Sequence, residues 1–572
     1  LIYVKMGNQK TMKPETMPSE TVNSDAVRRA TGEVGLSERA RSWRSGFMIM
    51  LAAVVIAPAF FGCAGFSMPP RESPSPPLFA DPEPVKTDVA LTEGGEMEKT
   101  AVPPEPKPAP VDVSIAEAVM MALENNRGII MQRLEPEIAR TAEDEARAAF
   151  DPVLSAAITD GRTRTDEIDD DDLRRRSTDV EAQIEQFLPT GTDIRAEFSA
   201  RRVDPGTGPT RYETRAGISA TQALLAGRGL EPNLALLRQA RIDTLFSDYE
   251  LHGFAQDLVA RVETTYWEYV LARRQVEIYT GSLELAEQQL DETRHRIRVG
   301  GLAETDLAAA QAEVALRREA LNNAKSRVNR IRVRLSRLIH PGGLLGIDTE
   351  LTPQTMPIVP EEGPDDIAAH LDLAMRMRPD LRQARLLLDR GELDLVLTRN
   401  GLLPRMDLFI RLGKTGYADS FGQSAENIDN DGYDIAGGLE FLIPVGNRAA
   451  QARHRRAVLS QRQSTESLEN IRDLIREDVK IAYIETLRTR QQVDATAATR
   501  QFQEEKLRAE TAKFRVGIST GLHVAQAQRD LVTSQVAEVE AVTGFLIAMT
   551  ELYRVEGSLL ARRGISVSDH RR

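Results

Sequence analysis

The stretch KFRVGISTGLHVAQAQ at residues 513–528 closely matches IRVGGLAETDLAAAQ at residues 297–311. Each stretch places a Val-Gly break inside a helical pattern. Glycine readily adopts the left-handed backbone conformation that ends a helix and reverses the chain. The sequence therefore predicts two helical hairpins that turn at the same motif.

The similarity extends on both sides of the two turns. With a shift of 217 residues and no gap, Val262 pairs with Val479, Tyr266 with Tyr483, Val276 with Val493 and Leu290 with Leu507. A second register, shifted by 252 residues, pairs residues 122–129 with 374–381 and residues 150–152 with 402–404. The chain is therefore two copies of one unit, and the first copy holds an insertion of 35 residues (252 minus 217) between Pro152 and Val262.

Each copy predicts the same order of elements. A helix of about ten turns is followed by alternating strands, a very long helix, the Val-Gly break and a returning helix. In the first long helix apolar residues recur every seven positions, a period typical of helices that supercoil left-handedly: Val262, Tyr269, Val276, Leu283, Leu290 and Ile297. As single helices, residues 231–299 and 448–516 would each run on the order of 100 Å at ~1.5 Å per residue. Such rods must pack on one another and on neighbouring subunits.

Six stretches have the pattern of strands: residues 152–162, 178–188, 191–201, 211–225, 405–417 and 432–443. Apolar and charged residues alternate in the second and third, which fits a membrane barrel wall and equally a soluble sheet with one wet face. The 35 inserted residues suffice for one extra hairpin, with its turn at Pro189, Thr190 and Gly191. We therefore expect four strands in the first copy and two in the second.

The N-terminal region predicts export. Arg41 and Arg44 precede an apolar run from Phe47 to Gly62, which ends at Cys63, the single cysteine. This is the layout of a signal peptide, and the run is shorter than the ~20 residues that a membrane helix needs. Its FFGC ending resembles a bacterial lipobox, in which the cysteine is acylated; the alternative is an incidental thiol in an uncleaved membrane helix. The following residues 67–110 are rich in proline and predict an extended tether.

Composition and motifs argue against several classes of function. The net charge of −13 and the pI near 5.3 make nucleic acid an unlikely partner. Scattered histidines, without a nucleophile elbow or a phosphate-binding loop, predict no catalytic residue, no metal site and no cofactor. NIDNDG at residues 427–432 begins like a calcium loop, but its twelfth position is Gly438 rather than glutamate. The acidic stretch 166–172 predicts a solvated loop, or divalent-cation bridging to lipid head groups.

Four features together resemble the TolC-type outer-membrane efflux protein family. They are ALENN at residues 122–126, the doubled Arg-Val-Gly turn followed by Ala-Gln, the duplicated order of elements and the lipobox. The resemblance covers roughly residues 113–557 and implies a mainly α fold with a membrane β-barrel. In such proteins a homotrimer builds an outer-membrane β-barrel that is continued by a long α-helical coiled-coil tunnel.

The resemblance also implies a function and partners. The trimer would lie in outer-membrane lipid, anchored by acylated Cys63, and extend into the periplasm. It would be the passive exit duct of a tripartite efflux or type I secretion system, joined to a periplasmic adapter (membrane fusion) protein and an inner-membrane transporter. The family usually supplies four strands per chain and 12 in all. Six strands per chain would give 18, unless the extra hairpin folds outside a 12-stranded barrel.

Site residues follow from the resemblance in two groups. The tips that adapters would dock against are Arg298, Val299, Gly300, Gly301, Arg515, Val516, Gly517, Ile518 and Ser519, although these residues could merely form good turns. The aperture candidates are Asp306, His523 and Gln526, because the best-known family member has acidic residues six and nine positions after its second tip glycine. Three His523 side chains around the axis would be charged in mild acid and would favour opening; the alternative is that His523 faces solvent or a neighbouring helix.

These observations give the following expected organisation: a signal-peptide region (1–62), the acylated cysteine and tether (63–112), a first repeat (113–340), a linker (341–365), a second repeat (366–557) and a C-terminal tail (558–572). A different class of function is a structural coiled-coil lipoprotein that tethers envelope layers without forming a channel. That class explains the rods and Cys63, but it explains neither the alternating strands nor the duplication.

Overall fold

The computed structural model describes residues 111–165, 173–206, 208–300, 303–339, 350–361, 363–430 and 432–566. Contacts divide the chain into residues 1–102 and 103–572, and all described residues belong to the second unit. The expected signal peptide, Cys63, the Pro-rich stretch 67–110, Gly301 and the acidic stretch 166–172 lie outside the described residues.

A pair of helices leads into the strands in each copy. These are α2 (Ile115–Asn125) and α3 (Arg127–Ala148), and α7 (Ile367–Met377) and α8 (Pro379–Asn400). The prediction of one uninterrupted helix is therefore wrong, because Asn126 and Arg378 have extended backbone. The Asn126 side chain caps α3 by accepting a hydrogen bond from the Gly128 N–H (2.8 Å), and Pro379 excludes Arg378 from the helical conformation.

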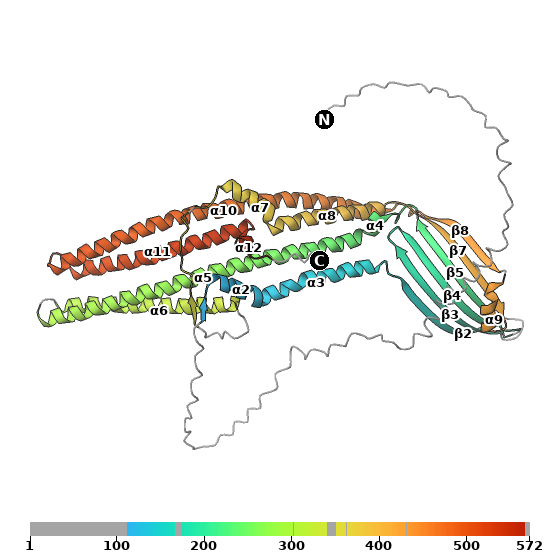
Figure 1. Cartoon of the computed structure of the whole chain (residues 1–572), viewed down its shortest axis with the longest axis horizontal. Helices are drawn as coiled ribbons and strands as arrows, with labels where there is room; N and C mark the ends of the chain where they lie inside the picture. Colours follow the sequence, from blue (N-terminus) through green and yellow to red (C-terminus); the bar gives the residue numbers. More distant parts are fainter. Residues whose placement is uncertain are drawn as a thin grey trace, which may run out of the picture. The chain divides into compact units, whose positions relative to one another are not determined.

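Two long helical hairpins follow the strands, as the sequence predicts. The first is α5 (Ala235–Arg298) with α6 (Thr305–Ile339), and the second is α10 (Arg448–Arg515) with α11 (Gly521–Val555) (Figure 1). The long helices have 64 and 68 residues, although the first is preceded by a separate turn, α4 (Leu230–Asn233). By length and composition α11 alone among the described helices could cross a membrane, but it packs against α10 and α5 within this fold. A four-residue helix, α12 (Leu559–Arg562), ends the described chain.

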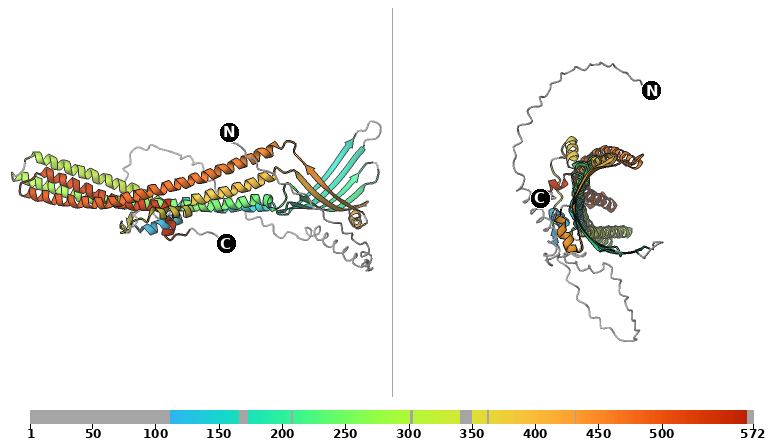
Figure 2. Two further views of the ribbon diagram at one scale, coloured as in Figure 1. Left: turned by 90° about the horizontal axis from the view of Figure 1, so that it is seen from above. Right: turned by 90° about the vertical axis from the view of Figure 1, so that its right-hand side faces the viewer.

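All six expected strands form, and they make one antiparallel sheet. In chain order they are β2 (Val153–Thr165), β3 (Leu173–Leu188), β4 (Thr192–Asp204), β5 (Arg211–Ala223), β7 (Arg405–Ala418) and β8 (Tyr433–Leu442), and their order in the sheet is the same. The extra hairpin, β3 and β4, is thus part of the sheet. Pairing of β5 with β7 joins the two copies, and the sheet is curved when seen end-on (Figure 2). The expected bounds agree with the observed ones to within about five residues.

Short elements complete the fold beside the middle of α5 and at the end of the sheet that is remote from the helices. A parallel pair, β1 (Val111–Val113) and β6 (Leu351–Pro353), lies against α5, because the Tyr266 hydroxyl donates to the Val113 carbonyl (3.0 Å) and the Tyr269 hydroxyl to the Leu351 carbonyl (2.7 Å). These tyrosines belong to the largest hydrophobic core, built from α2, α5 and α6. Helix α9 (Phe421–Glu426) and the turn η1 (Asn427–Asp429) connect β7 to β8.

Candidate functional site

One face of the sheet is largely apolar, and within the chain α9 and η1 cover it only at the ends of β5 and β7 that are remote from the helices. Its side chains come from alternate positions of all six strands: Leu154, Ile158, Val180, Ile184, Ile194, Phe198, Ile218, Ile410, Leu412, Ile435 and Leu439. Leu154 is 70% exposed and Ile435 is 67% exposed. On β8 the band from Tyr433 to Phe441 measures about 27 Å along the strand, or roughly 20 Å in height at a tilt of about 40°. An apolar band of this height fits the hydrocarbon layer of a membrane.

The opposite face carries charged side chains that pair across the strands. Arg201 forms an ion pair with Asp179 (2.9 Å) and Arg195 with Glu185 (3.0 Å). Further along the sheet, Arg215 lies between Glu197 (3.4 Å) and Asp434 (2.8 Å). Charges of both signs are stable where water reaches them. The two faces together fit a barrel wall between lipid and a wet lumen better than a soluble sheet, which would need a core on its apolar face.

The extra hairpin is tied to the helices at its turn between β3 and β4. The Asn233 side-chain amide donates to the carbonyl oxygens of Pro189 (3.1 Å), Gly227 (2.7 Å) and Gly229 (2.8 Å). Gly191 has a φ of +84°, and a Cβ atom there would lie 2.1 Å from the Gly227 oxygen. The sequence predicted this turn but gave no sign of Asn233, because its partners come from two other segments of the chain.

The two predicted tips are tight turns at the far ends of the hairpins. Gly300 has a φ of +77° and Gly517 a φ of +80°, the conformation that only glycine adopts readily. After the second hairpin's long helix, the Ile518 N–H donates to the Lys513 carbonyl (2.9 Å). Ile518 is 79% exposed and Val516 is 70% exposed, so apolar side chains project from the turn. The structure thus forms the second turn, with Arg515 and Ser519 beside it, and the described part of the first turn, with Arg298 and Val299 beside Gly300.

Three contacts at the tips were not part of the sequence-based prediction. The Glu510 carboxylate pairs with the Lys513 ammonium (2.7 Å) and accepts a hydrogen bond from the Ser519 hydroxyl (2.8 Å). The hydrogen bond from Lys513, and then that from Ser519, lower the pKa of Glu510. The Arg296 guanidinium lies 4.9 Å from the centre of the Phe514 ring, which links the first hairpin to the second. The ion pair of Glu510 with Lys513 has helical spacing and could have been predicted from the sequence. The contact of Arg296 with Phe514 depends on how the hairpins pack.

The three aperture candidates lie near the tips. Asp306 is in the first turn of α6, and His523 and Gln526 are in the first turns of α11. All three side chains are exposed, and no ion pair joins His523 to Asp306 in the described part of the chain. A spacing of three residues puts His523 and Gln526 on one side of α11. A single chain therefore leaves these groups available to whatever faces them from another copy.

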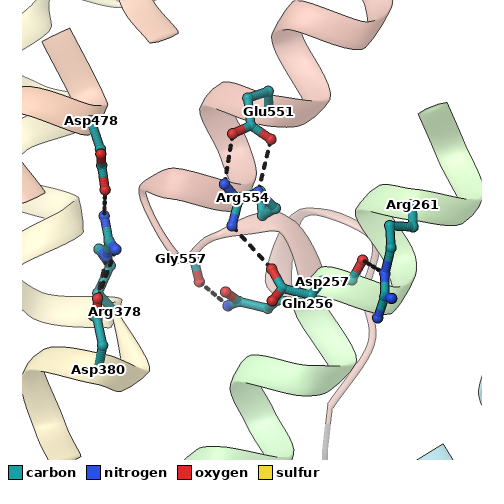
Figure 3. A network of polar contacts seen from close by, with 9 residues as sticks. All are labelled: Gln256, Asp257, Arg261, Arg378, Asp380, Asp478, Glu551, Arg554 and Gly557. Atoms are coloured by element: carbon teal, nitrogen blue, oxygen red, sulfur yellow. Dashed lines mark hydrogen bonds and ion pairs between the residues drawn. The ribbon is translucent and has the colours of Figure 1, made fainter. Parts of the chain in front are cut away.

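Polar side chains link the two copies midway along the helices (Figure 3). Arg554 on α11 donates to both Glu551 oxygens (2.8 and 2.6 Å) and to Asp257 on α5 (3.0 Å). The Gln256 amide donates to the Gly557 carbonyl (2.6 Å). These contacts fix the first repeat's long helix to the end of the second repeat.

A second set of ion pairs stabilises the same region. Arg378, at the break between α7 and α8, pairs with Asp380 (2.7 Å) and with Asp478 on α10 (2.9 Å). Burial alone would lower the pKa of Arg378, but the hydrogen bonds to the two carboxylates outweigh burial and raise it. The buried Glu263 carboxylate accepts two hydrogen bonds from Arg563 (2.6 and 2.7 Å), which holds the expected C-terminal tail against α5.

Comparison with known proteins gives consistent matches. Residues 118–339 and 370–558 match the model of the outer membrane efflux protein family. The outer membrane efflux protein BepC of Brucella suis biovar 1 (strain 1330) is 23% identical over 372 residues, covering 64% of this chain and 77% of BepC.

Solved structures with the same fold include outer-membrane channels. The CmeC outer membrane channel of Campylobacter jejuni has a TM-score of 0.59 at 15% identity, covering 78% of this chain and 86% of CmeC. The open state of the MtrE outer membrane channel of Neisseria gonorrhoeae has a TM-score of 0.54 at 18% identity, covering 78% of this chain and 89% of MtrE. A membrane protein from Pseudomonas aeruginosa has a TM-score of 0.59 at 19% identity, covering 77% of this chain and 90% of that one.

Proposed function

The chain belongs to the outer membrane efflux protein family, and we propose that three copies of it build the exit duct of an export system. It is an outer-membrane channel protein that extends into the periplasm. The observation that carries the proposal is the six-stranded sheet, with one apolar exposed face and one charged face, at the end of two long helical hairpins. A coiled-coil lipoprotein that only tethers envelope layers does not require such a sheet, so the structural-tether alternative is not favoured.

The sheet edges support closure by other copies. Among the described residues β2 and β8 each pair on one side only. Unpaired backbone groups in lipid cost several kcal/mol each, so open edges do not persist in a membrane. With six antiparallel strands, β2 and β8 run in opposite directions, and β8 of one copy can continue as an antiparallel pair with β2 of the next. Six strands from each of three copies give 18, and such a barrel is about one and a half times as wide as one of 12.

The outermost helices support the same arrangement. Helix α3 contacts α5, α5 contacts α8, and α8 contacts α10, which leaves α3 and α10 at the two edges. Both edges expose large apolar side chains, which are Met131, Leu134 and Ile138 on α3 and Leu474, Ile481 and Ile484 on α10. Exposed apolar stripes on edge helices mark surfaces that another chain covers. We propose that α10 of one copy packs on α3 of the next.

The tips are the proposed contact with the adapter protein. Val516 and Ile518 offer apolar side chains, and Arg298 and Arg515 offer charge beside them, on turns held by Gly300 and Gly517. An inner-membrane transporter would then be joined through the adapter. Asp306, His523 and Gln526 would line the aperture that the tips surround. Within each chain we propose residues 113–340 and 366–557 as the two repeats, joined by the linker 341–365 and followed by the tail 558–572.

The proposed lipid anchor is Cys63, which follows the signal-peptide region 1–62 and begins the segment 63–112 that contains the tether. Growth with a radioactive fatty acid should label the unmutated protein but not Cys63→Ser. Absence of label on the unmutated protein would end the anchor proposal without affecting the channel, since the strands give a separate hold on the membrane.

Conductance in planar lipid bilayers tests the channel function. The purified full chain should produce discrete, long-lived current steps. A structural tether should give none, so a protein that inserts into the bilayer without current steps would contradict the proposal.

A further inference from the structure

Three arginines lie at the ends of strands β2, β3 and β4 that are remote from the helices. Arg162, Arg176 and Arg202 occupy the alternate positions that continue the apolar face, two to four residues beyond Ile158, Val180 and Ala200. Their side chains therefore belong to the lipid side of the wall, just past its apolar band. Arg176 is 46% exposed and Arg162 is exposed, so both guanidinium groups are accessible.

The arginines oppose one another within the sheet. Arg162 is the direct cross-strand partner of Arg176, and directly opposite side chains have Cβ atoms about 5 Å apart. Like charges at this distance destabilise a sheet. Arg176 donates to Asp160 (3.3 and 3.2 Å), while Arg162 forms no ion pair with any residue that the structure describes. Two carboxylates lie on this face beside the arginines: Asp160, and Asp204, which is the cross-strand partner of Arg176 on β4. With Arg202 the three arginines carry one more charge than these carboxylates, so an additional anion would stabilise the group.

Arg202 adds a third donor on the neighbouring strand. It pairs with Thr178 across the sheet, which puts it on the diagonal from Arg176, about 7–8 Å away. Its guanidinium stacks on the Tyr212 ring (5.8 Å), and Tyr212 meets the edge of Phe421 on α9 (4.8 Å). The Arg202 Nε is buried and has no hydrogen-bond partner in the described part of the chain. A buried donor without an acceptor costs free energy, so an acceptor that reaches this N–H would stabilise the fold.

We propose that Arg162, Arg176 and Arg202 bind phosphate groups of the anionic glycolipid in the outer leaflet of the membrane. The proposal rests on the proposed function, because that function sets the apolar face toward lipid and the remote strand ends toward the cell exterior. Phosphate carries the missing negative charge, and its oxygens match the forked donors of arginine. Tyr212 is the direct cross-strand partner of Arg202, and membrane barrels place aromatic side chains at the level of the lipid head groups.

The test compares two triple variants of the full-length trimer. The first variant removes the proposed site by combining Arg162→Gln, Arg176→Gln and Arg202→Gln. The matched control removes the same charge from the opposite face of β3, β4 and β5. It combines Arg175→Gln, Arg201→Gln and Arg211→Gln. Native mass spectrometry with added diphosphorylated lipid A, and with its dephosphorylated form, gives the bound lipid per chain. Conductance of every variant is recorded in parallel.

We expect the dissociation constant for the phosphorylated lipid to rise at least about tenfold in the first variant and to stay within about twofold in the control. Equal binding by both variants, or equal binding of the dephosphorylated lipid, would overturn the site. Displacement of the lipid by millimolar inorganic phosphate would also overturn it, since the site would then serve a free anion.

The acidic stretch next to these strands provides a further check. If the trimer with its native arginines binds the phosphorylated lipid only after residues 169–172 are changed to asparagine, those carboxylates are the partners of the arginines and the proposal is wrong. Current steps that persist while lipid binding fails would refute the lipid site alone, whereas missing current steps in the unmutated protein would refute the channel itself.

Discussion

At the residue scale, two glycines decide whether the hairpin tips form. Gly300 and Gly517 both have φ near +80°, where a residue with a Cβ atom is strained and proline cannot go. The Gly517 N–H also donates to the Phe514 carbonyl (3.1 Å), a bond that proline would remove. No heavy atom lies within 4 Å of a Cβ built at either glycine, so crowding of a side chain adds no constraint.

We expect Gly517→Pro to distort the second tip and to reduce adapter binding at least about tenfold while the trimer still assembles. Gly517→Asn is the matched control, because asparagine tolerates the left-handed conformation, and its binding should stay within a factor of about two. The measurement is co-purification of the adapter with the trimer. Undiminished recovery from a chain with both Gly300→Pro and Gly517→Pro would refute the tips as the docking surface.

The Glu510 contacts make the second tip sensitive to acid. Lys513 and Ser519 bind the ionised carboxylate and lower its pKa below the ordinary 4.5, so their stabilisation is complete above that value and is lost as the pH falls through the lowered pKa. The protection factors of the amide hydrogens of residues 513–521 should therefore fall on acidification below about pH 4.5. Glu510→Gln should show low protection factors already at neutral pH and little further change; an unmutated tip whose protection factors are independent of pH would contradict this account.

At the element scale, the sequence predicted the strands better than the lead-in helices. Alternation with a period of two residues identifies each strand from its own sequence. The difference of 35 residues between the two repeat registers predicted the extra hairpin. The break at Asn126 escaped notice because asparagine can occur within a helix, and the Asn126 amide also donates to the Leu338 carbonyl (3.0 Å), far away in sequence. The matching break at Arg378 could have been predicted from the proline that follows it, Pro379. Contacts such as Arg563 with Glu263, 300 residues apart, depend on tertiary packing and carry no local signal.

Asn233→Ala should loosen the extra hairpin, because three carbonyl oxygens of the turn region lose their donor. Leaving such groups unsatisfied costs about 1–3 kcal/mol, so the strand signal in circular dichroism should melt a few degrees lower. Asn323→Ala, at an exposed position of α6, is the control and should leave the melting temperature unchanged. Gly191→Ala should be more damaging, because its Cβ would collide with the Gly227 oxygen. Equal melting of all three variants would show that the turn does not hold the hairpin.

At the scale of the whole molecule, the chain consists of two matching copies that differ in their number of strands. The repeated hairpins and their tips follow from two matching copies, and the sequence predicted them. The strand count departs from this symmetry, since the first copy supplies four strands and the second two. Only the strands next to the helices, β2, β5, β7 and β8, continue into α3, α5, α8 and α10. In the proposed trimer the extra hairpin would therefore widen the barrel wall without adding a helix to the tunnel.

Electron cryomicroscopy of the purified protein in lipid nanodiscs tests this account most directly, because it counts the strands of the assembled wall. We predict three copies around one axis and a closed barrel of 18 strands, with β3 and β4 of every copy inside the wall and β8 of each copy paired with β2 of the next. A 12-stranded barrel with β3 and β4 outside it, or an assembly whose β2 and β8 edges stay unpaired, would contradict the account.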